Sequence, residues 1–318
     1  MAGARITVAI DNYDRHGPLL QGAVTHPGFD FQFIESVQDG VGGRHEEFLN
    51  SWAWDVAELS LSTYLIAVDL GLPVAAIPVF PRRLFSQSQL YINRNSGING
   101  PRDLPGKRVA LGTYQTTLSV LAKGDLSHYY NVPWKEITYV TAGKEAVEVR
   151  LPPEVKLERG ESTGQMEEDL IAGRIHAQFT PRPPKAFLEG NPNIVRLFND
   201  PRGEEERHLK QPGYYPIMHV VAYQKKLAAR HPELPRALFK VFEEARKRAR
   251  HHWNDPNWSL LLWGKQEMER EACVTGRDVW ANGIEANRKN IQDFTQYSHE
   301  QGLTRRVFNP EELFVDVQ

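Results

Sequence analysis

Short apolar runs alternate with stretches of helical spacing along the first two thirds of the chain. The apolar runs predict strands at residues 5–10, 29–34, 56–59, 74–79, 90–93, 107–112, 137–140, 175–179, 195–198 and 217–223. Between them, helical spacing predicts helices at residues 44–52, 63–70, 115–126 and 165–172. This alternation of strands and helices is typical of α/β proteins with largely parallel sheets.

The last third of the chain is predicted to be helical. From Pro232 onward, apolar residues such as Leu238, Val241 and Phe242 recur at helical spacing, and a second long helix is predicted at residues 277–297. We therefore expect two α/β lobes around a cleft, with a helical C-terminal region. The first lobe would span residues 1–95 plus 216–318, and the second residues 96–215. The cleft between the lobes is the expected ligand site.

Composition narrows the protein class. The chain has 318 residues and a formal net charge of -2, with charges spread throughout, so we expect no nucleic-acid partner. Cys273 is the only cysteine, which excludes an internal disulfide and Cys-rich zinc sites. No apolar stretch approaches the roughly 18 residues of a membrane span. Residues 1–5 lead directly into a predicted strand without an apolar leader, so we expect a cytoplasmic location.

Polar side chains follow two predicted strands at their carboxyl ends. Glu58, Ser60 and Ser62 lie where the strand at 56–59 meets a helix, and Arg82 and Arg83 follow the strand at 74–79. Open α/β sheets place ligands at this edge. Because guanidinium groups bind carboxylates in a bidentate manner, the pattern favours a small acidic ligand. Ser60 and Ser62 can equally cap the helix at 63–70, and one of the two arginines is expected to be solvated.

Two segments resemble type II periplasmic-binding-protein folds. The sequence Asp103-Leu104-Pro105-Gly106-Lys107-Arg108-Val109-Ala110 resembles the segment that opens their second lobe. The sequence Leu170-Ile171-Ala172-Gly173-Arg174-Ile175-His176-Ala177 resembles their helix-to-strand passage, with His176 where an acidic residue is common. The resemblance implies a two-lobed receptor fold.

Three further segments are more specific. In chain order they are Ala57 to Ser62, Ile77 to Arg83, and Tyr215-Pro216-Ile217-Met218-His219. In that order they resemble the 4,5-dihydroxyphthalate decarboxylase family, whose enzymes are built on the receptor fold. The resemblance runs from residue 13 to about residue 245. One departure is the stretch at residues 85–88, where the family often has a histidine, and it bears on the identity of the substrate.

The resemblance implies non-oxidative loss of CO2 from a hydroxylated aromatic dicarboxylate such as 4,5-dihydroxyphthalate. The ring carbon that loses CO2 must gain a proton from a general acid, and His219 is the leading candidate because histidine titrates near neutral pH. Glu58 is the candidate acceptor of a substrate hydroxyl proton. As alternatives, His219 can be a core histidine and Glu58 a buried carboxylate paired with an arginine.

Candidate substrate-binding residues come from several predicted loops and helix starts. The carboxylate clamps are Arg83, favoured by its place in the family segment, its neighbour Arg82, and Arg182 in a proline-bounded loop. The remaining candidates are Tyr13 and Arg15 after the first strand, Ser60 and Ser62, and Thr116 and Thr117 at a predicted helix N-terminus. Arg15 can instead pair with a nearby aspartate, and the two threonines can serve as caps.

No motif demands a metal or another cofactor, so none is expected, although a divalent cation bound to vicinal hydroxyls stays an open alternative. Three other functions compete with the decarboxylase. A solute-binding receptor for an aromatic or other small acid fits the same fold. A pyrimidine-precursor synthase of the thiamine type is disfavoured by the single cysteine, and a ligand sensor by the lack of a helix-turn-helix segment. Apolar residues in the tail, Trp258, Leu261, Leu262 and Trp263, leave homo-oligomerisation open.

Overall fold

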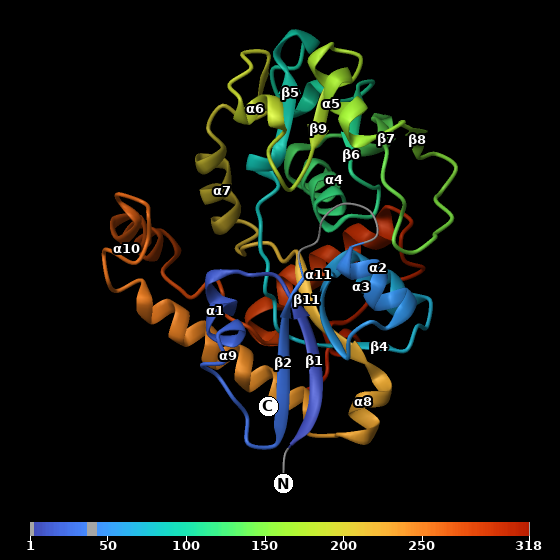
Figure 1. Cartoon of the computed structure of the whole chain (residues 1–318). Helices are drawn as coiled ribbons and strands as arrows, with labels where there is room; N and C mark the ends of the chain where they lie inside the picture. The colour runs from blue at the N-terminus through green and yellow to red at the C-terminus, as the bar shows by residue number, and fades with distance from the viewer. Residues whose placement is uncertain (1–2, 37–42, 318) are drawn as a thin grey trace. The chain divides into compact units, whose positions relative to one another are not determined.

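The computed structural model describes residues 3–36 and 43–317, and the chain divides into two compact units (Figure 1). Unit 1 comprises Met1–Arg82, His219–Arg288 and Asn309–Gln318, and unit 2 comprises Arg83–Met218 and Lys289–Phe308. Met1 and Ala2, on which the expected cytoplasmic location partly rests, lie outside the described residues.

Unit 1 is built on a five-stranded sheet with the order β2-β1-β3-β11-β4. Its strands are β1 (Ala4–Ile10), β2 (Phe29–Glu35), β3 (Val56–Ser60), β4 (Val74–Ile77) and β11 (His219–Gln224). Strand β1 runs parallel to β2 and β3, whereas β11 runs antiparallel to both β3 and β4. The last strand of the described residues, β11, therefore lies inside the sheet between β3 and β4, two strands formed early in the sequence.

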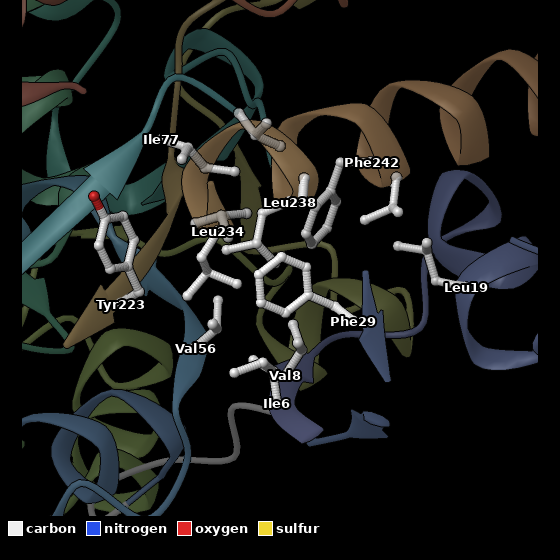
Figure 2. Packing of buried hydrophobic residues seen from close by; sticks show 14 of the residues in the cluster. Ile6, Val8, Leu19, Phe29, Val56, Ile77, Tyr223, Leu234, Leu238 and Phe242 are labelled. Carbon is white, nitrogen blue, oxygen red and sulfur yellow. The ribbon is translucent and has the colours of Figure 1, made fainter. Parts of the chain in front are cut away.

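One face of this sheet is covered by α9 (Leu234–His252). Its apolar residues recur at helical spacing and pack against strand residues such as Val8 and Val56 (Figure 2). Leu238 of α9 is completely buried in this core, and truncation of such a leucine to alanine costs about 2–5 kcal/mol. The hydrophobic core thus fixes the sheet on which the candidate residues are carried.

Shorter helices complete unit 1. They are α1 (Gly17–Leu20), α2 (Arg44–Ser51), α3 (Leu61–Asp69), α8 (Lys225–Arg230), α10 (Gly264–Thr275) and α12 (Pro310–Leu313). Helix α3 follows β3 without an intervening loop, and it begins where the Ser60 hydroxyl accepts a hydrogen bond from the Thr63 amide. The turn after α3 is made by Gly71, whose φ of 77° suits glycine.

Unit 2 has a six-stranded sheet with the order β10-β5-β9-β6-β7-β8. Its strands are β5 (Leu90–Asn93), β6 (Arg108–Leu111), β7 (Thr138–Thr141), β8 (Lys156–Arg159), β9 (Ala177–Phe179) and β10 (Ile194–Arg196). Its helices are α4 (Thr117–Tyr130), α5 (Thr163–Ile171), α6 (Lys185–Leu188), α7 (Pro201–Lys210) and most of α11 (Ile284–Glu300). Strands β9, β6, β7 and β8 are parallel, while β5 and β10 add antiparallel pairs at one side.

The predicted strands and helices of the α/β part are confirmed to within a few residues. The prediction of a helix at 277–297 was wrong at its start, because Gly283 adopts a φ of 94° and α11 begins only at Ile284. Several elements were not predicted, β8 and α7 among them. Every residue of β8 is exposed, and His208 is the one buried residue of α7, so neither has a readable apolar pattern.

The two units also differ from the predicted division at residues 95 and 216. Residues 83–95 group with unit 2 because β5 pairs with β9 and β10 of its sheet. Residues 289–308 also group with unit 2. One contact of this segment with unit 2 is the hydrogen bond of 2.8 Å that the Gln301 side-chain amide donates to the Val120 carbonyl in α4. Among the described residues, no helix has both the length and the apolar character needed to span a membrane.

Candidate active site

Three strand ends in unit 1 bring polar residues together. Asp11 directly follows β1, Glu58 lies near the carboxyl end of β3, and His219 opens β11. Because β11 is antiparallel to β3, its first residues lie at the carboxyl end of β3. The register pairs His219 with Ser60 and Val221 with Glu58, so His219 and Glu58 are diagonal neighbours on one face.

Glu58 is the centre of a hydrogen-bond network. Its Oε1 lies 2.5 Å from Nδ1 of His219 and accepts a bond of 3.0 Å from the Tyr13 hydroxyl. Its Oε2 accepts a bond of 3.2 Å from the Asp11 amide. The Glu58 side chain is fully buried, whereas the His219 side chain keeps 8% of its surface exposed. Of this pair, therefore, His219 is the member that solvent or a ligand can reach.

Arg44 supplies the positive charge inside the network. Its fully buried guanidinium lies 3.6 Å from Oε1 of Glu58 and 3.0 Å from Oδ2 of Asp11. Its Nε donates to the Glu58 carbonyl at 2.8 Å, and Nη1 donates to the Ser36 carbonyl. Arg44 was not among the residues expected from the sequence, since one arginine at the start of a short helix has no pattern that separates it from a solvated one.

The charges of this cluster decide its protonation state. Burial alone would raise the pKa of Glu58, but the Arg44 charge and the hydrogen bond from His219 hold this pKa well below its usual value. Burial lowers the pKa of His219, and the adjacent Glu58 carboxylate opposes that effect. At neutral pH the resting pair is thus an ionised Glu58 and a neutral His219 whose Nδ1–H points at the carboxylate.

Two more histidines flank the pair. The His45 ring stands edge-on to the His219 ring with 5.1 Å between centroids, and burial lowers its pKa well below the usual value. The His16 Nδ1 lies 2.8 Å from the Asp11 carbonyl, and burial lowers the pKa of His16 to about 4. Neutral imidazoles therefore surround the Glu58 carboxylate at pH 7, while Arg44 provides its counter-charge.

Tyr13 and Arg15 approach the network from the loop after β1. The Tyr13 hydroxyl lies within hydrogen-bond distance of both Glu58 and Asp11 Oδ2, the latter at 3.1 Å. The Arg15 guanidinium lies 4.1 Å from the centroid of the Tyr13 ring and 4.2 Å from that of Trp280, and its Nε donates to the Pro81 carbonyl at 2.6 Å. Arg15 also pairs with Asp14 at 3.3 Å, as the sequence alternative had it.

The remaining candidates of unit 1 differ in exposure. Ser60 acts as the N-cap of α3, and Ser62 is completely buried in its first turn. Arg82 is half-buried, and its carbonyl accepts a hydrogen bond from the His219 amide at 3.3 Å. Its charge adds to the effect of burial in lowering the pKa of His219, whereas it opposes the larger effect of burial that raises the pKa of Tyr13. Arg82 is thus the candidate arginine of unit 1 whose backbone bonds to that of His219 and whose charge acts on the His219 ring.

Four candidates belong to unit 2. Arg83 is buried and donates to the Tyr215 carbonyl at 2.8 Å, and Arg182 is exposed in a loop where its carbonyl accepts a bond from the Thr180 hydroxyl. Thr116 caps α4 by accepting a hydrogen bond from the Ser119 amide, and Thr117 is buried in the first turn. The capping alternative thus holds for Thr116, and Arg83 is tied to the backbone of its own unit.

One group among the described residues has metal-ligating atoms in reach of each other. Single ligand atoms of Asp11, Glu58 and His219 lie within 4.8 Å of one another. Arg44, however, already places its guanidinium against both carboxylates, and a cation there would face that charge. The arrangement therefore suits a carboxylate–histidine pair with an arginine counter-ion better than a metal centre.

Comparison with solved structures supports the fold. The aliphatic sulphonate binding protein SsuA from Escherichia coli aligns with a TM-score of 0.59 at 13% identity, over 99% of this chain and 93% of that protein. The desulfurization enzyme DSZB aligns with a TM-score of 0.53 at 14% identity, over 98% and 96%. The predicted α/β, periplasmic-binding-protein-like fold is confirmed by these alignments.

Comparison with curated sequences supplies the family. No protein-family model matches the chain. A 4,5-dihydroxyphthalate decarboxylase from Comamonas testosteroni is 32% identical over 326 residues, covering 99% of this chain and 97% of the relative. A second from Pseudomonas putida is 31% identical over 208 residues, covering 62% and 78%. Such similarity over nearly the whole length of the first relative shows that this chain belongs to the 4,5-dihydroxyphthalate decarboxylase family.

Proposed function

We propose that this protein decarboxylates 4,5-dihydroxyphthalate without oxidation, releasing CO2 and 3,4-dihydroxybenzoate. The near full-length similarity to a decarboxylase of that name carries the proposal. In the reaction the bond between the ring and one carboxylate breaks, and a proton takes the place of CO2 on the same carbon. The substrate hydroxyl para to that carbon donates electrons, which stabilises the protonated ring before CO2 leaves.

We assign the proton transfer to His219, because it is the member of the Glu58–His219 pair whose side chain keeps some accessible surface, 8% against 0%. His219 is neutral at rest, and a bound dicarboxylate adds negative charge that raises its pKa. The imidazolium then formed is stabilised by the Glu58 carboxylate at 2.5 Å. The proton passes from the ring nitrogen that is not bonded to Glu58 to the ring carbon, and water reprotonates His219 after each turnover.

Glu58 takes a different role from the one expected from the sequence. Its oxygens accept hydrogen bonds from Tyr13 and Asp11, face His219 and Arg44, and are fully buried. A carboxylate so occupied is poorly placed to take a hydroxyl proton directly from a substrate. We therefore propose that Glu58 positions His219 and holds its charge, as the carboxylate does in other carboxylate–histidine pairs.

Arg82 is our proposed ligand for a substrate carboxylate. It is half-buried, and its charge acts on the same His219 that would deliver the proton. A guanidinium at this position would orient the carboxylate by two parallel hydrogen bonds. Arg83, Arg182, Thr116 and Thr117 of unit 2 stay proposals for further substrate contacts, as do Arg15, Ser60 and Ser62 of unit 1. The cytoplasmic location also stays a proposal, which cell fractionation would test.

The deciding experiment measures CO2 release and ring product with 4,5-dihydroxyphthalate. Phthalate is the matched control substrate, because it lacks the electron-donating hydroxyls and should not turn over. The matched variant is His219→Asn, since the asparagine amide can still donate to Glu58 but cannot deliver a proton at neutral pH. We expect turnover by the native protein, none with phthalate, and a loss of about 100-fold or more in the variant.

The same experiment separates the decarboxylase from a solute-binding receptor. Binding is measured by calorimetry alongside turnover, with native protein and His219→Asn. Native protein that binds 4,5-dihydroxyphthalate but releases no CO2 would favour the receptor. Full turnover in His219→Asn would refute the role of His219 while leaving the decarboxylase intact.

A further inference from the structure

A segment of unit 1 carries an unusual run of exposed apolar side chains. Residues 253–275, here called the arm, comprise a loop and α10, and they extend beyond the C-terminal end of α9 (Figure 1). Within α10 only Gly264 is buried. Five large apolar residues in a stretch of six are exposed, namely Trp258, Leu260, Leu261, Leu262 and Trp263. Single exposed apolar residues are ordinary, but a contiguous patch of this kind marks an interaction surface.

The size of the patch matches a stable protein interface. Leu260 is completely exposed and Leu262 is 81% exposed, while Trp258, at 49%, is the least exposed of the five. A fully exposed tryptophan or leucine has an accessible surface on the order of 200 Å². With their observed exposed fractions, the five residues together present on the order of 700 Å² of surface. A standard interface buries about 800 Å² on each partner. The arm therefore holds nearly enough apolar surface for one such contact.

The charges of the arm indicate what covers it. Helix α10 contains Lys265 and Arg270 against Glu267, Glu269 and Glu271, two positive charges against three negative ones. A helix that lies on a membrane would instead carry an excess of Lys and Arg on its polar face. The charge of α10 itself therefore favours a protein partner over lipid.

The neighbouring end of α9 has the opposite charge. Lys247, Arg248 and Arg250 are exposed in its last two turns, whereas Glu267 and Glu269 are exposed on α10. In a two-fold symmetric pair each patch occurs twice, so the basic end of one α9 can face the acidic α10 of the other chain. A single chain type thus supplies both halves of a complementary contact.

From these observations we propose that the arm docks against the arm of a second copy of this chain, forming a two-fold dimer. The exposed leucines and tryptophans form its apolar centre, and the α9 and α10 charges form its rim. This inference is independent of the proposed decarboxylation, because it uses no residue of the His219 site.

Sedimentation analysis of the full chain tests the dimer. We expect native protein to sediment as a dimer at micromolar concentration, and Leu260→Glu/Leu262→Glu to raise the dimer dissociation constant at least about 100-fold, since it buries unpaired carboxylates. The matched control is Leu188→Glu in unit 2, which changes another exposed leucine and should leave the dimer intact. Monomeric native protein, or a dimer that survives the double substitution, would overturn the proposal.

Cys273 allows a second readout that does not depend on folding of a variant. It is the only cysteine and is exposed on α10, so one spin label per chain attaches within the arm. Labelled native protein should show a dipolar signal between two labels that disappears on dilution with unlabelled protein. A dimer without this signal would place the contact elsewhere and contradict the proposal.

Charge reversal tests the rim. Glu267→Lys/Glu269→Lys and Lys247→Glu/Arg250→Glu should each weaken self-association at low salt, because both symmetric contacts become repulsive. An equal mixture of the two variants should form a mixed dimer, because both contacts are then attractive again. No recovery in the mixture would refute the charge pairing of α9 with α10.

Discussion

Nδ1 of His219 lies 2.5 Å from Oε1 of Glu58, although 161 residues separate them in the chain. The pairing of β11 with β3 makes this contact, since Val221 lies opposite Glu58 and His219 is two residues earlier on the same face. Arg44 then holds the carboxylate ionised from a third element, α2. The expected behaviour of these groups can be measured one substitution at a time.

Removing the charge of Glu58 should lower the pKa of His219. Glu58→Gln keeps the side-chain size but removes the carboxylate. The charge of that carboxylate and its hydrogen bond with His219 both raise the pKa of His219. With less imidazolium at neutral pH, we expect kcat/KM to fall about 100-fold and its pH optimum to move to lower pH. The measurement is the pH profile of kcat/KM.

The matched control for Glu58 is Glu47→Gln, an exposed glutamate on α2. It should leave both rate and profile unchanged. A Glu58→Gln variant with a native pH profile would show that Glu58 does not set the protonation of His219.

Replacing Arg44 should destabilise the fold. Arg44→Met leaves the buried carboxylates of Glu58 and Asp11 without their counter-charge, and breaking such a pair typically costs about 3–5 kcal/mol. Urea unfolding at pH 7 measures the loss. Arg202→Met, in an exposed pair with Glu206, should change stability by less than about 0.5 kcal/mol. Equal losses in the two variants would contradict a special role for Arg44.

Arg44 should also set how stability responds to acid. Glu58 has a folded pKa below its unfolded value, so its contribution is complete above the unfolded pKa, about 4.3, and is lost as the pH falls below it. In Arg44→Met the folded pKa rises, so this part of the acid dependence should shrink. Urea unfolding of native protein and variant between about pH 6 and pH 2.5 covers the window below the unfolded pKa, and parallel curves there would contradict the prediction.

Tyr13→Phe tests whether the phenol supports the network or the chemistry. The variant deletes the hydroxyl that donates to Glu58 at 3.0 Å but keeps the ring against Arg15. Loss of one buried hydrogen bond should cost about 1–2 kcal/mol of stability and reduce kcat about tenfold. Activity assays give the change in kcat, and thermal unfolding gives the change in stability. A loss of kcat beyond about 1000-fold would place Tyr13 in the proton transfer itself.

Protonation of His16 should destabilise the protein in mild acid. Its pKa falls from 6.5 to about 4 through burial, so its neutral form contributes stability that is complete above 6.5 and is lost as the pH falls. At pH 5 the loss from this one group is about 2 kcal/mol. His16→Gln should flatten the dependence between pH 7.5 and 5, whereas His251→Gln, at an exposed position, should not. Identical slopes for native protein and His16→Gln would contradict this.

Chelation should leave turnover unchanged. Arg44 already neutralises the carboxylates that would otherwise bind a divalent cation. We therefore expect the same kcat before and after dialysis against a strong chelator. Activity that is lost on chelation and restored by Mg²⁺ or Mn²⁺ would instead assign a metal to the group formed by Asp11, Glu58 and His219.

Much of the fold was readable because its signals are local. The strand at 56–59 is a continuous buried run, and the helix after it starts at a serine cap. Elements that are mostly polar, such as α7 and β8, were missed because too few of their residues are buried to leave an apolar pattern in the sequence. The unit boundaries also differed, because the partners of β5 and of the segment at 289–308 are distant in sequence.

The sequence by itself determined the α/β class, most strand and helix positions, the family segments, and the choice of Glu58 and His219 as candidates. Only the tertiary structure decided that these two residues touch, that Arg44 joins them, and that Arg82 lies beside His219. Hydrophobic periodicity and capping involve residues only a few positions apart, so they can be recognised in short stretches of the sequence. A buried charge network instead depends on strand pairing across the whole chain. Its members are not separated by any regular number of residues, so the sequence gives no pattern that links them.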